Sequence, residues 1–267
     1  MDTGIFRHMD FDTRIAGFAD FVGRKKYLYD DNGLGTHVAG IIAGSGKGSN
    51  GKYRGIAPDT FLVSVKVLDK SGNGKIENVV EAAGWIIENK SAMNIRVVNI
   101  SFGTRAKMEN GPAIETGEDD YALIMAVEKM WDSGIVVVAA AGNNGPGNTS
   151  VTAPGISKKI ITVGAFDDKN FFSGRGPTRE CIVKPEVVVT GSNIIACNNR
   201  QGRYSSKSGT SMAAPVVSGA VARLIKNNPD ITPKEVKIWM KSCCKKINVP
   251  SEKQGWGVLD IRKFVTG

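Results

Sequence analysis

A serine lies in a turn of small residues that leads directly into an apolar helical pattern, within residues 208–215 (SGTSMAAP). This pattern predicts that Ser211 stands at a helix N-terminus, where backbone N–H groups and the helix dipole favour negative charge. A nucleophilic serine gains from that position because its attack on a carbonyl carbon generates an oxyanion. The alternative interpretation is that Thr210 or Ser211 simply caps the helix.

Three further segments carry residues suited to the same chemistry. Residues 139–145 (AAAGNNG) follow an apolar strand pattern. The amide of Asn143 can donate to a developing oxyanion there, or it can belong to a simple asparagine-rich turn. The other two segments are residues 32–40 (NGLGTHVAG) and residues 2–5 (DTGI), which contain Asp2. Each segment alone is weak evidence, since Asp-Thr-Gly also marks a different class of protease and many turns.

The order of these segments resembles that of the subtilisin family, in which the catalytic triad runs Asp, His, Ser along the chain. The resemblance covers nearly the whole chain, from Asp2 to the helix after Ser211. It implies a serine endopeptidase that works through an acyl-enzyme on Ser211. Shorter pieces that are similar to the family are residues 55–58 (GIAP), 65–68 (VKVL), 99–103 (NISFG) and 172–177 (FSGRGP).

The resemblance implies a role for each matching residue. Asp2 matches the aspartate that orients the histidine, Ser211 matches the nucleophile, and Asn143 matches the oxyanion-hole amide, which the Ser211 backbone N–H assists. Glycines along the cleft would let a substrate backbone approach closely. The residues that match the substrate cleft are Ser101, Phe102 and Gly103 on one wall, Ala140, Ala141 and Gly142 on the other, and Gly72, Asn73 and Gly74 in the edge segment that pairs with an extended substrate.

The chain departs from the family at the general base. The family has His-Gly-Thr-His-Val-Ala-Gly, whereas residues 34–40 read LGTHVAG, so Leu34 occupies the histidine position. Leucine can neither take the proton from Ser211 nor give one to the leaving amine. The only histidines are His8 and His37, and His37 lies one helical turn, about 5 Å, beyond position 34. We therefore expect an inactive or severely impaired peptidase; the alternative is a pseudoprotease that binds peptides or partner proteases without cleavage.

Two other features bear on the site. The chain begins one residue before Asp2, so we expect the strand that leads into this aspartate in the family to be missing and Asp2 to be poorly fixed. Residues 44–55 are rich in glycine, serine, lysine and asparagine and lack a recognisable calcium loop. No cofactor or metal is predicted, and a structural calcium ion has no support. Whether Leu34 is natural or engineered is left open.

The elements that must position these residues alternate along the chain. Short, nearly continuous apolar runs predict buried parallel strands, and the patterns between them place apolar residues on one face of a helix. This alternation indicates an α/β fold with a doubly wound, mostly parallel sheet flanked by helices, in which ligands bind beyond the carboxyl ends of the strands. The predicted strands are 61–68, 96–100, 135–139, 160–163 and 187–189, and the predicted helices are 75–90, 119–132, 210–227 and 233–246.

Length and composition narrow the class of protein. The 267 residues show no repeat or linker, which predicts one subtilisin-like domain over residues 1–267. No apolar stretch is long enough to span a membrane, and the first residues do not read as a signal peptide. Four cysteines without a C-x-x-C pair are typical of free thiols in a reducing compartment. We therefore expect a cytoplasmic protein, with secretion of a longer precursor left open.

The charge pattern bears on partners. The net charge of +9 is spread along the chain without the aromatic and basic platform of a nucleic-acid site. Neither nucleic acid nor a membrane is therefore expected as a partner. The expected partner is an extended polypeptide, either a substrate or a pro-segment.

Overall fold

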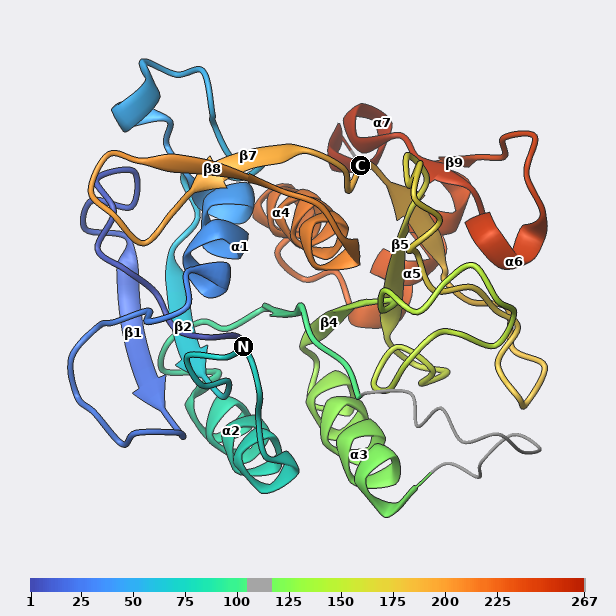
Figure 1. Ribbon diagram of the computed structural model, residues 1–267, viewed down its shortest axis with the longest axis horizontal. Helices are drawn as coiled ribbons and strands as arrows, with labels where there is room; N and C mark the ends of the chain where they lie inside the picture. The colour runs from blue at the N-terminus through green and yellow to red at the C-terminus, as the bar shows by residue number, and fades with distance from the viewer. Residues whose placement is uncertain (105–116, 267) are drawn as a thin grey trace.

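The computed structural model describes residues 1–104 and 117–266 of the chain. Its centre is a six-stranded sheet, in which four of the five predicted apolar runs lie side by side (Figure 1). The fifth, residues 61–68, contains β2 (Leu62–Lys66), which belongs to a separate pair of strands. Neighbouring strands of the central sheet pair in parallel except at the last edge, where the pairing is antiparallel. In spatial order the strands are β3 (Val97–Ile100), β4 (Val136–Ala140), β5 (Ile161–Ala165), β6 (Val187–Val189), β10 (Val258–Leu259) and β9 (Cys244–Lys245).

Helices cover both faces of this sheet. One hydrophobic cluster joins α1, α4, α5 and α7 to one face, and a second joins α2 and α3 to the other. Every residue of β4, β5 and β6 is buried, as expected for strands covered on both sides. The predicted α/β fold is therefore confirmed. The helices are α1 (Leu34–Ala43), α2 (Ile76–Asn89), α3 (Glu118–Asp132), α4 (Thr210–Asn227), α5 (Pro233–Ser242), α6 (Ser251–Gln254) and α7 (Ile261–Thr266), with a 3₁₀ turn at Lys47–Ser49.

A separate parallel pair, β1 (Ile15–Asp20) and β2 (Leu62–Lys66), lies beyond the β3 edge. The first two residues of the chain connect this pair to the central sheet. Asp2 forms a parallel bridge with Lys66 at the end of β2, and the Met1 ammonium donates to the Asn99 carbonyl in β3 at 3.0 Å. The carboxyl ends of β2 and β3 therefore lie close to Asp2.

Two parts of the fold differ from the sequence-based expectation. The helix predicted over 233–246 ends at Ser242, and the next residues form β9 instead. This pairing with β10 needs Gly257, whose φ of 121° suits glycine and where a Cβ would overlap the Lys245 carbonyl. The second difference is a set of strands that the apolar pattern did not predict: β1 and the hairpin of β7 (Ile194–Cys197) and β8 (Tyr204–Lys207).

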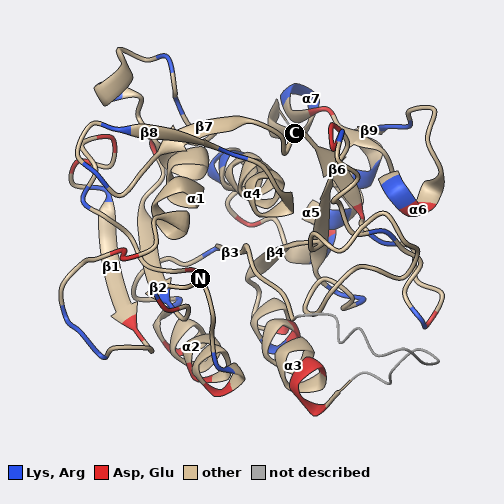
Figure 2. Ribbon diagram, in the orientation of Figure 1, with Lys and Arg blue, Asp and Glu red and all other residues tan. Residues whose placement is uncertain are grey.

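Charged residues are distributed over many elements. Figure 2 shows lysine and arginine on separate loops and helices, with acidic residues along α2 and α3. In the part of the chain that the structure describes, no helix combines the length and hydropathy needed to cross a membrane.

Candidate active site

The predicted site residues lie along the carboxyl edge of the parallel strands. The N-terminus of α1 reaches this edge, because the Gly35 N–H donates to Thr3, the residue after the Asp2 bridge. The C-terminus of α1 lies at the opposite edge, where Arg14 donates to the carbonyl groups of Ala43 and Thr60 just ahead of β2. Helix α1 thus runs antiparallel to the strands.

Helix α4 packs against α1 and runs the same way. Ser211, at its start, contacts Ser101 directly after β3. Eight residues later, a Cβ on Gly219 would lie 3.4 Å from the carbonyl oxygen of Ile42, which lies eight residues after Leu34. The two helices are therefore in register, and residues 34 and 211 lie at the same end. This arrangement brings Asp2, Leu34 and Ser211 to one edge of the sheet.

Ser211 is held by reciprocal hydrogen bonds with Ser101. The Ser211 hydroxyl donates to the Ser101 carbonyl at 2.7 Å, and the Ser101 hydroxyl donates to the Ser211 carbonyl at 3.1 Å. Ser211 is the second residue of α4, so its own backbone N–H belongs to the unpaired first turn of the helix. The residue before the helix, Gly209, has a φ of 146°, which suits glycine and opens this turn.

The Asn143 amide faces the same turn in a defined orientation. Its Oδ1 accepts hydrogen bonds from the Thr210 backbone N–H and hydroxyl, both at 3.0 Å. Because a backbone N–H requires an acceptor, this contact identifies Oδ1 and leaves Nδ2 as the outward donor. Asn143 itself is exposed, and a Cβ on Gly209 would lie 3.3 Å from Nδ2. The Asn143 amide therefore lies against the first turn of α4, which contains the Ser211 N–H.

Asp2 is firmly held, so the expectation that it is poorly fixed is wrong. Its N–H donates to the Val65 carbonyl, and its carbonyl accepts from the Val67 N–H, both at 3.0 Å. The side chain is only 6% exposed. One carboxylate oxygen, Oδ1, accepts from the Thr3 N–H at 2.8 Å, whereas Oδ2 is buried with no hydrogen-bond partner among the described residues. Burial raises the pKa of Asp2 to about 6, although the nearby Met1 ammonium and the Thr3 N–H oppose this shift.

Leu34 is the first residue of α1, and its side chain packs against the cluster formed by α1, α4 and the sheet. The helix start is held by Asp30, which the sequence motifs did not identify. Its carboxylate accepts from the Gly33 N–H at 2.7 Å and from the Thr36 N–H at 2.8 Å. It also accepts from the Thr3 hydroxyl at 2.8 Å and so joins α1 to the Asp2 segment. The Asp-Asp-Asn-Gly sequence before the helix was an available signal for such a cap.

Both histidines are engaged away from Ser211. His37 is fully buried, and its Nε2 lies 3.2 Å from the Ile194 carbonyl and 2.9 Å from the Ser205 carbonyl. Burial lowers the pKa of His37 to about 4, so its ring is neutral at neutral pH. His8 Nε2 lies 3.1 Å from the Arg203 carbonyl, and burial lowers the pKa of His8 as well.

The predicted cleft walls stand next to each other around one further residue, Thr152, which the sequence motifs did not identify. A Cβ on Gly103 or on Gly142 would overlap its Oγ1. Thr152 is 7% exposed, and its hydroxyl has no hydrogen-bond partner among the described residues. Thr152 thus leaves no room for a side chain at position 103 or at position 142, so only glycine fits at either. Of the predicted wall residues, Ser101, Ala140 and Ala141 are buried, Phe102 and Gly142 are half-buried, and Gly103 is exposed.

The predicted edge segment is an exposed turn after β2. The Asp69 carboxylate accepts from the N–H groups of Ser71 at 2.8 Å and Asn73 at 3.0 Å. Gly72 has a φ of 77°, and a Cβ on Gly74 would lie 2.8 Å from the Val67 carbonyl. The turn therefore depends on both glycines, and Gly72, Asn73 and Gly74 lie at the surface.

Comparisons with known proteins agree with this geometry. The Peptidase S8 family model, described as the subtilase family, matches residues 1–257. The serine protease AprX of Bacillus subtilis (strain 168) is 42% identical over 269 residues, which cover 91% of this chain and 59% of AprX. Subtilisin DY of Bacillus licheniformis is 35% identical over 240 residues, which cover 89% of this chain and 79% of that protein. The chain therefore spans about three fifths of AprX.

Two solved structures are similar throughout the chain. The structure titled Sphericase has a TM-score of 0.82 and 25% identity, and the match covers 97% of this chain and 89% of that one. The crystal structure of a cold adapted subtilisin-like serine proteinase has a TM-score of 0.77 and 30% identity, and the match covers 97% of this chain and 84% of that one.

Proposed function

The chain belongs to the subtilase family, and from this premise we propose a subtilisin-like serine endopeptidase domain whose turnover on Ser211 is blocked or strongly impaired by Leu34. One observation carries the impairment. Position 34 offers no proton acceptor, while both histidines of the chain are engaged with main-chain carbonyl groups elsewhere. In the proposed site, Ser211 is the nucleophile and Asn143 is the oxyanion donor.

The environment of Asp2 supports the same interpretation. In a serine triad the aspartate accepts a hydrogen bond from the imidazole and stabilises the cation that forms. Here Oδ2 of Asp2 is buried without a partner among the described residues, beside the start of α1. Because Leu34 has no side-chain N–H to donate, this carboxylate keeps its position and loses its function.

Covalent labelling tests the proposed impairment. The protein is incubated with a fluorophosphonate probe and a chromogenic peptide, alongside Ser211→Ala and an active subtilase. We expect labelling and hydrolysis close to those of Ser211→Ala, because an unassisted serine is a weak nucleophile at neutral pH. Labelling of Ser211 at the rate of the active enzyme would overturn the role given to Leu34.

A second candidate function is peptide binding without cleavage. It is favoured by the intact cleft walls and by the Asn143 donor, which do not depend on a general base. Calorimetry with a non-cleavable extended peptide tests it, with Gly103→Ala as the variant that crowds the cleft against Thr152. Gly84→Ala is the matched control, because a Cβ there meets no atom within 4 Å. Absence of binding, or equal binding by both variants, would exclude this function.

The compartment and the extent of the domain are further proposals. All four cysteines are free thiols, which supports a reducing, intracellular location. The family implies polypeptide substrates, and we propose an extended polypeptide or a pro-segment as the partner of the cleft. The assignment of residues 1–267 to one domain stays a prediction.

A further inference from the structure

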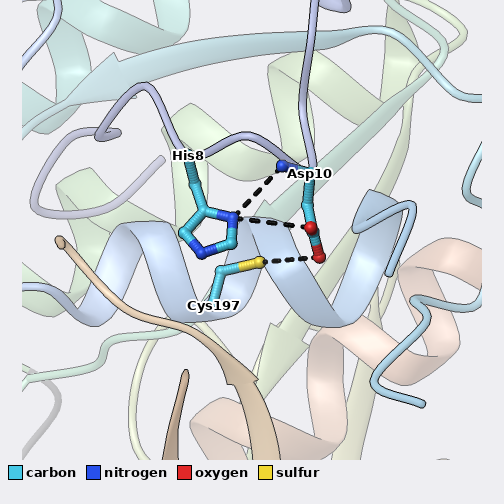
Figure 3. A group of neighbouring side chains, drawn as sticks. All are labelled: His8, Asp10 and Cys197. Atoms are coloured by element: carbon cyan, nitrogen blue, oxygen red, sulfur yellow. Dashed lines mark hydrogen bonds and ion pairs between the residues drawn. The ribbon is translucent and has the colours of Figure 1, made fainter. Parts of the chain in front are cut away.

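Three metal-ligating side chains meet in the interior, apart from Ser211. The His8–Asp10–Cys197 cluster joins the segment after Asp2 to the end of β7 (Figure 3). All three residues are buried, with at most 2% of any of them exposed. Cys197 Sγ lies 3.5 Å from Asp10 Oδ2, and His8 Nδ1 lies 3.7 Å from Asp10 Oδ1. The three ligand atoms of the cluster lie within 4.8 Å of one another.

These separations and donor types suit one class of cation. Tetrahedral zinc sites have bonds of about 2.0–2.3 Å, which place the ligand atoms about 3.3–3.7 Å apart. Thiolate and imidazole donors favour zinc and similar transition metals, whereas calcium and magnesium prefer sites made of oxygen ligands. We propose that His8 Nδ1, the Asp10 carboxylate and Cys197 Sγ bind a divalent cation of the zinc type.

The surroundings already orient each ligand. The Asp10 backbone N–H donates to His8 Nδ1 at 3.2 Å, so Nδ1 is the unprotonated nitrogen, and Nε2–H donates to the Arg203 carbonyl. A ligating histidine commonly makes this second contact to a carbonyl group. A cation bound at Nδ1 would take the place of the Asp10 N–H. The Asp10 carboxylate accepts from the N–H groups of Gly46 at 3.1 Å and Gly48 at 2.8 Å. The His8 ring is thus already in the tautomer that a cation at Nδ1 requires.

Charge balance gives an independent reason for a cation. The Asp10 carboxylate is fully buried, and no lysine or arginine of the described residues forms an ion pair with it. Its other partners, the Tyr204 hydroxyl at 2.9 Å and the N–H groups of Gly46 and Gly48, are all uncharged. A buried carboxylate without a cation is costly. Binding would replace the Cys197 thiol proton, which leaves to solvent, and would form a metal–thiolate bond. The dication, the thiolate and the carboxylate then sum to zero net charge.

Gly48 is exposed and lies between the cluster and solvent. A Cβ on Gly48 would lie 2.8 Å from Tyr204 Oη, 3.1 Å from Met9 Sδ and 3.4 Å from Asp10 Oδ1. Only glycine therefore fits at this position, and the turn packs closely over the cluster. The bound cation would tie together the residue 44–49 turn, the hairpin and α1, since a Cβ on Gly40 would lie 3.0 Å from Cys197 Sγ. It would therefore be a structural site.

Cobalt titration of the chelator-treated protein tests the proposal. We expect one equivalent of Co²⁺ to give a thiolate-to-cobalt absorption band and tetrahedral ligand-field bands, and we expect Zn²⁺ but not Ca²⁺ to displace it. Cys197→Ser should lose the thiolate band. His8→Gln should weaken binding at least tenfold, because it retains a donor near the Arg203 carbonyl but removes Nδ1. Cys181→Ser, at an exposed thiol, is the matched control and should bind as the unmodified protein does.

A second readout needs no variant and so does not depend on folding of Cys197→Ser. In the unmodified protein, Zn²⁺ should raise the melting temperature and slow alkylation of Cys197 relative to Cys181, as read from peptide masses. The proposal is overturned if no thiolate band forms, if the band survives in Cys197→Ser, or if Zn²⁺ changes neither the melting temperature nor the alkylation of Cys197.

Discussion

The Ser211 hydroxyl donates to the main-chain carbonyl of Ser101 at 2.7 Å. A carbonyl oxygen accepts this hydrogen bond but is too weak a base to remove the proton. The contact therefore orients the hydroxyl against the cleft wall without activating it. Since Leu34 offers no competing acceptor, the serine proposed as nucleophile has a resting position that favours its neutral form.

A histidine at position 34 should activate the Ser211 hydroxyl as a nucleophile. Leu34→His should place an imidazole at the start of α1, on the edge that also carries Asp2 and Ser211. In subtilisin itself, a member of this family, loss of the histidine costs about 10⁶ in kcat. We expect Leu34→His to raise fluorophosphonate labelling and peptide hydrolysis by at least about 10³, because the other residues of the proposed site, Asp2, Asn143 and Ser211, are all present.

The control for this gain is the double variant Leu34→His with Ser211→Ala, which should return to background. His37→Gln in the Leu34→His protein should retain the gain, because His37 bonds to the hairpin and not to Ser211. If Leu34→His folds and stays inert, the defect lies elsewhere than at position 34.

The oxyanion role of Asn143 can be separated from its structural role. Asn143→Asp in the Leu34→His protein keeps an oxygen for the Thr210 N–H but replaces the Nδ2 donor. We expect kcat to fall by about 10²–10³, the usual effect of removing one such donor. KM should change far less, since the oxyanion forms only during the reaction. A loss confined to KM would instead assign Asn143 to substrate binding.

Four strands of the central sheet, β3 to β6, could be predicted because they are largely apolar and buried; β9 and β10, of two residues each, could not. The runs at 135–139, 160–163 and 187–189 are apolar almost throughout. Short runs of this kind are typical of parallel strands that are covered by helices on both faces. The hairpin β7–β8 could not be predicted in the same way. Its second strand reads Tyr-Ser-Ser-Lys and pairs with β7 alone, so neither face needs to be apolar.

The proposed site residues could be named from the sequence because each lies within a short motif whose order is that of the family. Asp30 and Thr152 belong to no such motif. Asp30 acts through contacts with Thr3 and Thr36, and Thr152 lies between Gly103 and Gly142 only after the chain has folded. Firm fixation of Asp2 was missed for the same reason, since it depends on backbone bonds to β2 and the residue after it, which are distant in the sequence.

Asp30 is expected to be a large contributor to stability near the site. Asp30→Ala leaves the N–H groups of Gly33 and Thr36 and the Thr3 hydroxyl without their acceptor. Each buried unpaired group costs about 1–3 kcal/mol, and we expect a net loss of about 3 kcal/mol in urea unfolding. Asp12→Ala is the control, because its ion pair with Lys47 is exposed and worth about 0–1 kcal/mol. Equal losses in the two variants would refute the role given to Asp30.

Asp2 should make stability depend on pH. Burial raises the pKa of its carboxyl group from an ordinary value of 3.8, which the unfolded chain retains, to about 6 in the folded state. The folded state therefore binds the proton more tightly than the unfolded state. The raised pKa therefore lowers the free energy of unfolding in a pH-dependent way. The loss is near zero below about pH 4, grows as pH rises towards about 6, and is constant above that. With about 1.4 kcal/mol for each pH unit, the full cost approaches about 3 kcal/mol.

Replacing this carboxylate tests the sign directly. Asp2→Asn keeps the backbone bonds to β2 and cannot ionise, so its stability relative to the unmodified protein should rise between about pH 4 and pH 7 by up to about 3 kcal/mol. Urea unfolding across this pH range, in steps of about one unit, measures the difference. Asp230→Asn, on an exposed turn, is the control for replacing an aspartate by asparagine at the surface. A stability difference that stayed flat or fell as pH rose would contradict the prediction. It would mean that Oδ2 of the buried carboxylate has a partner in solution.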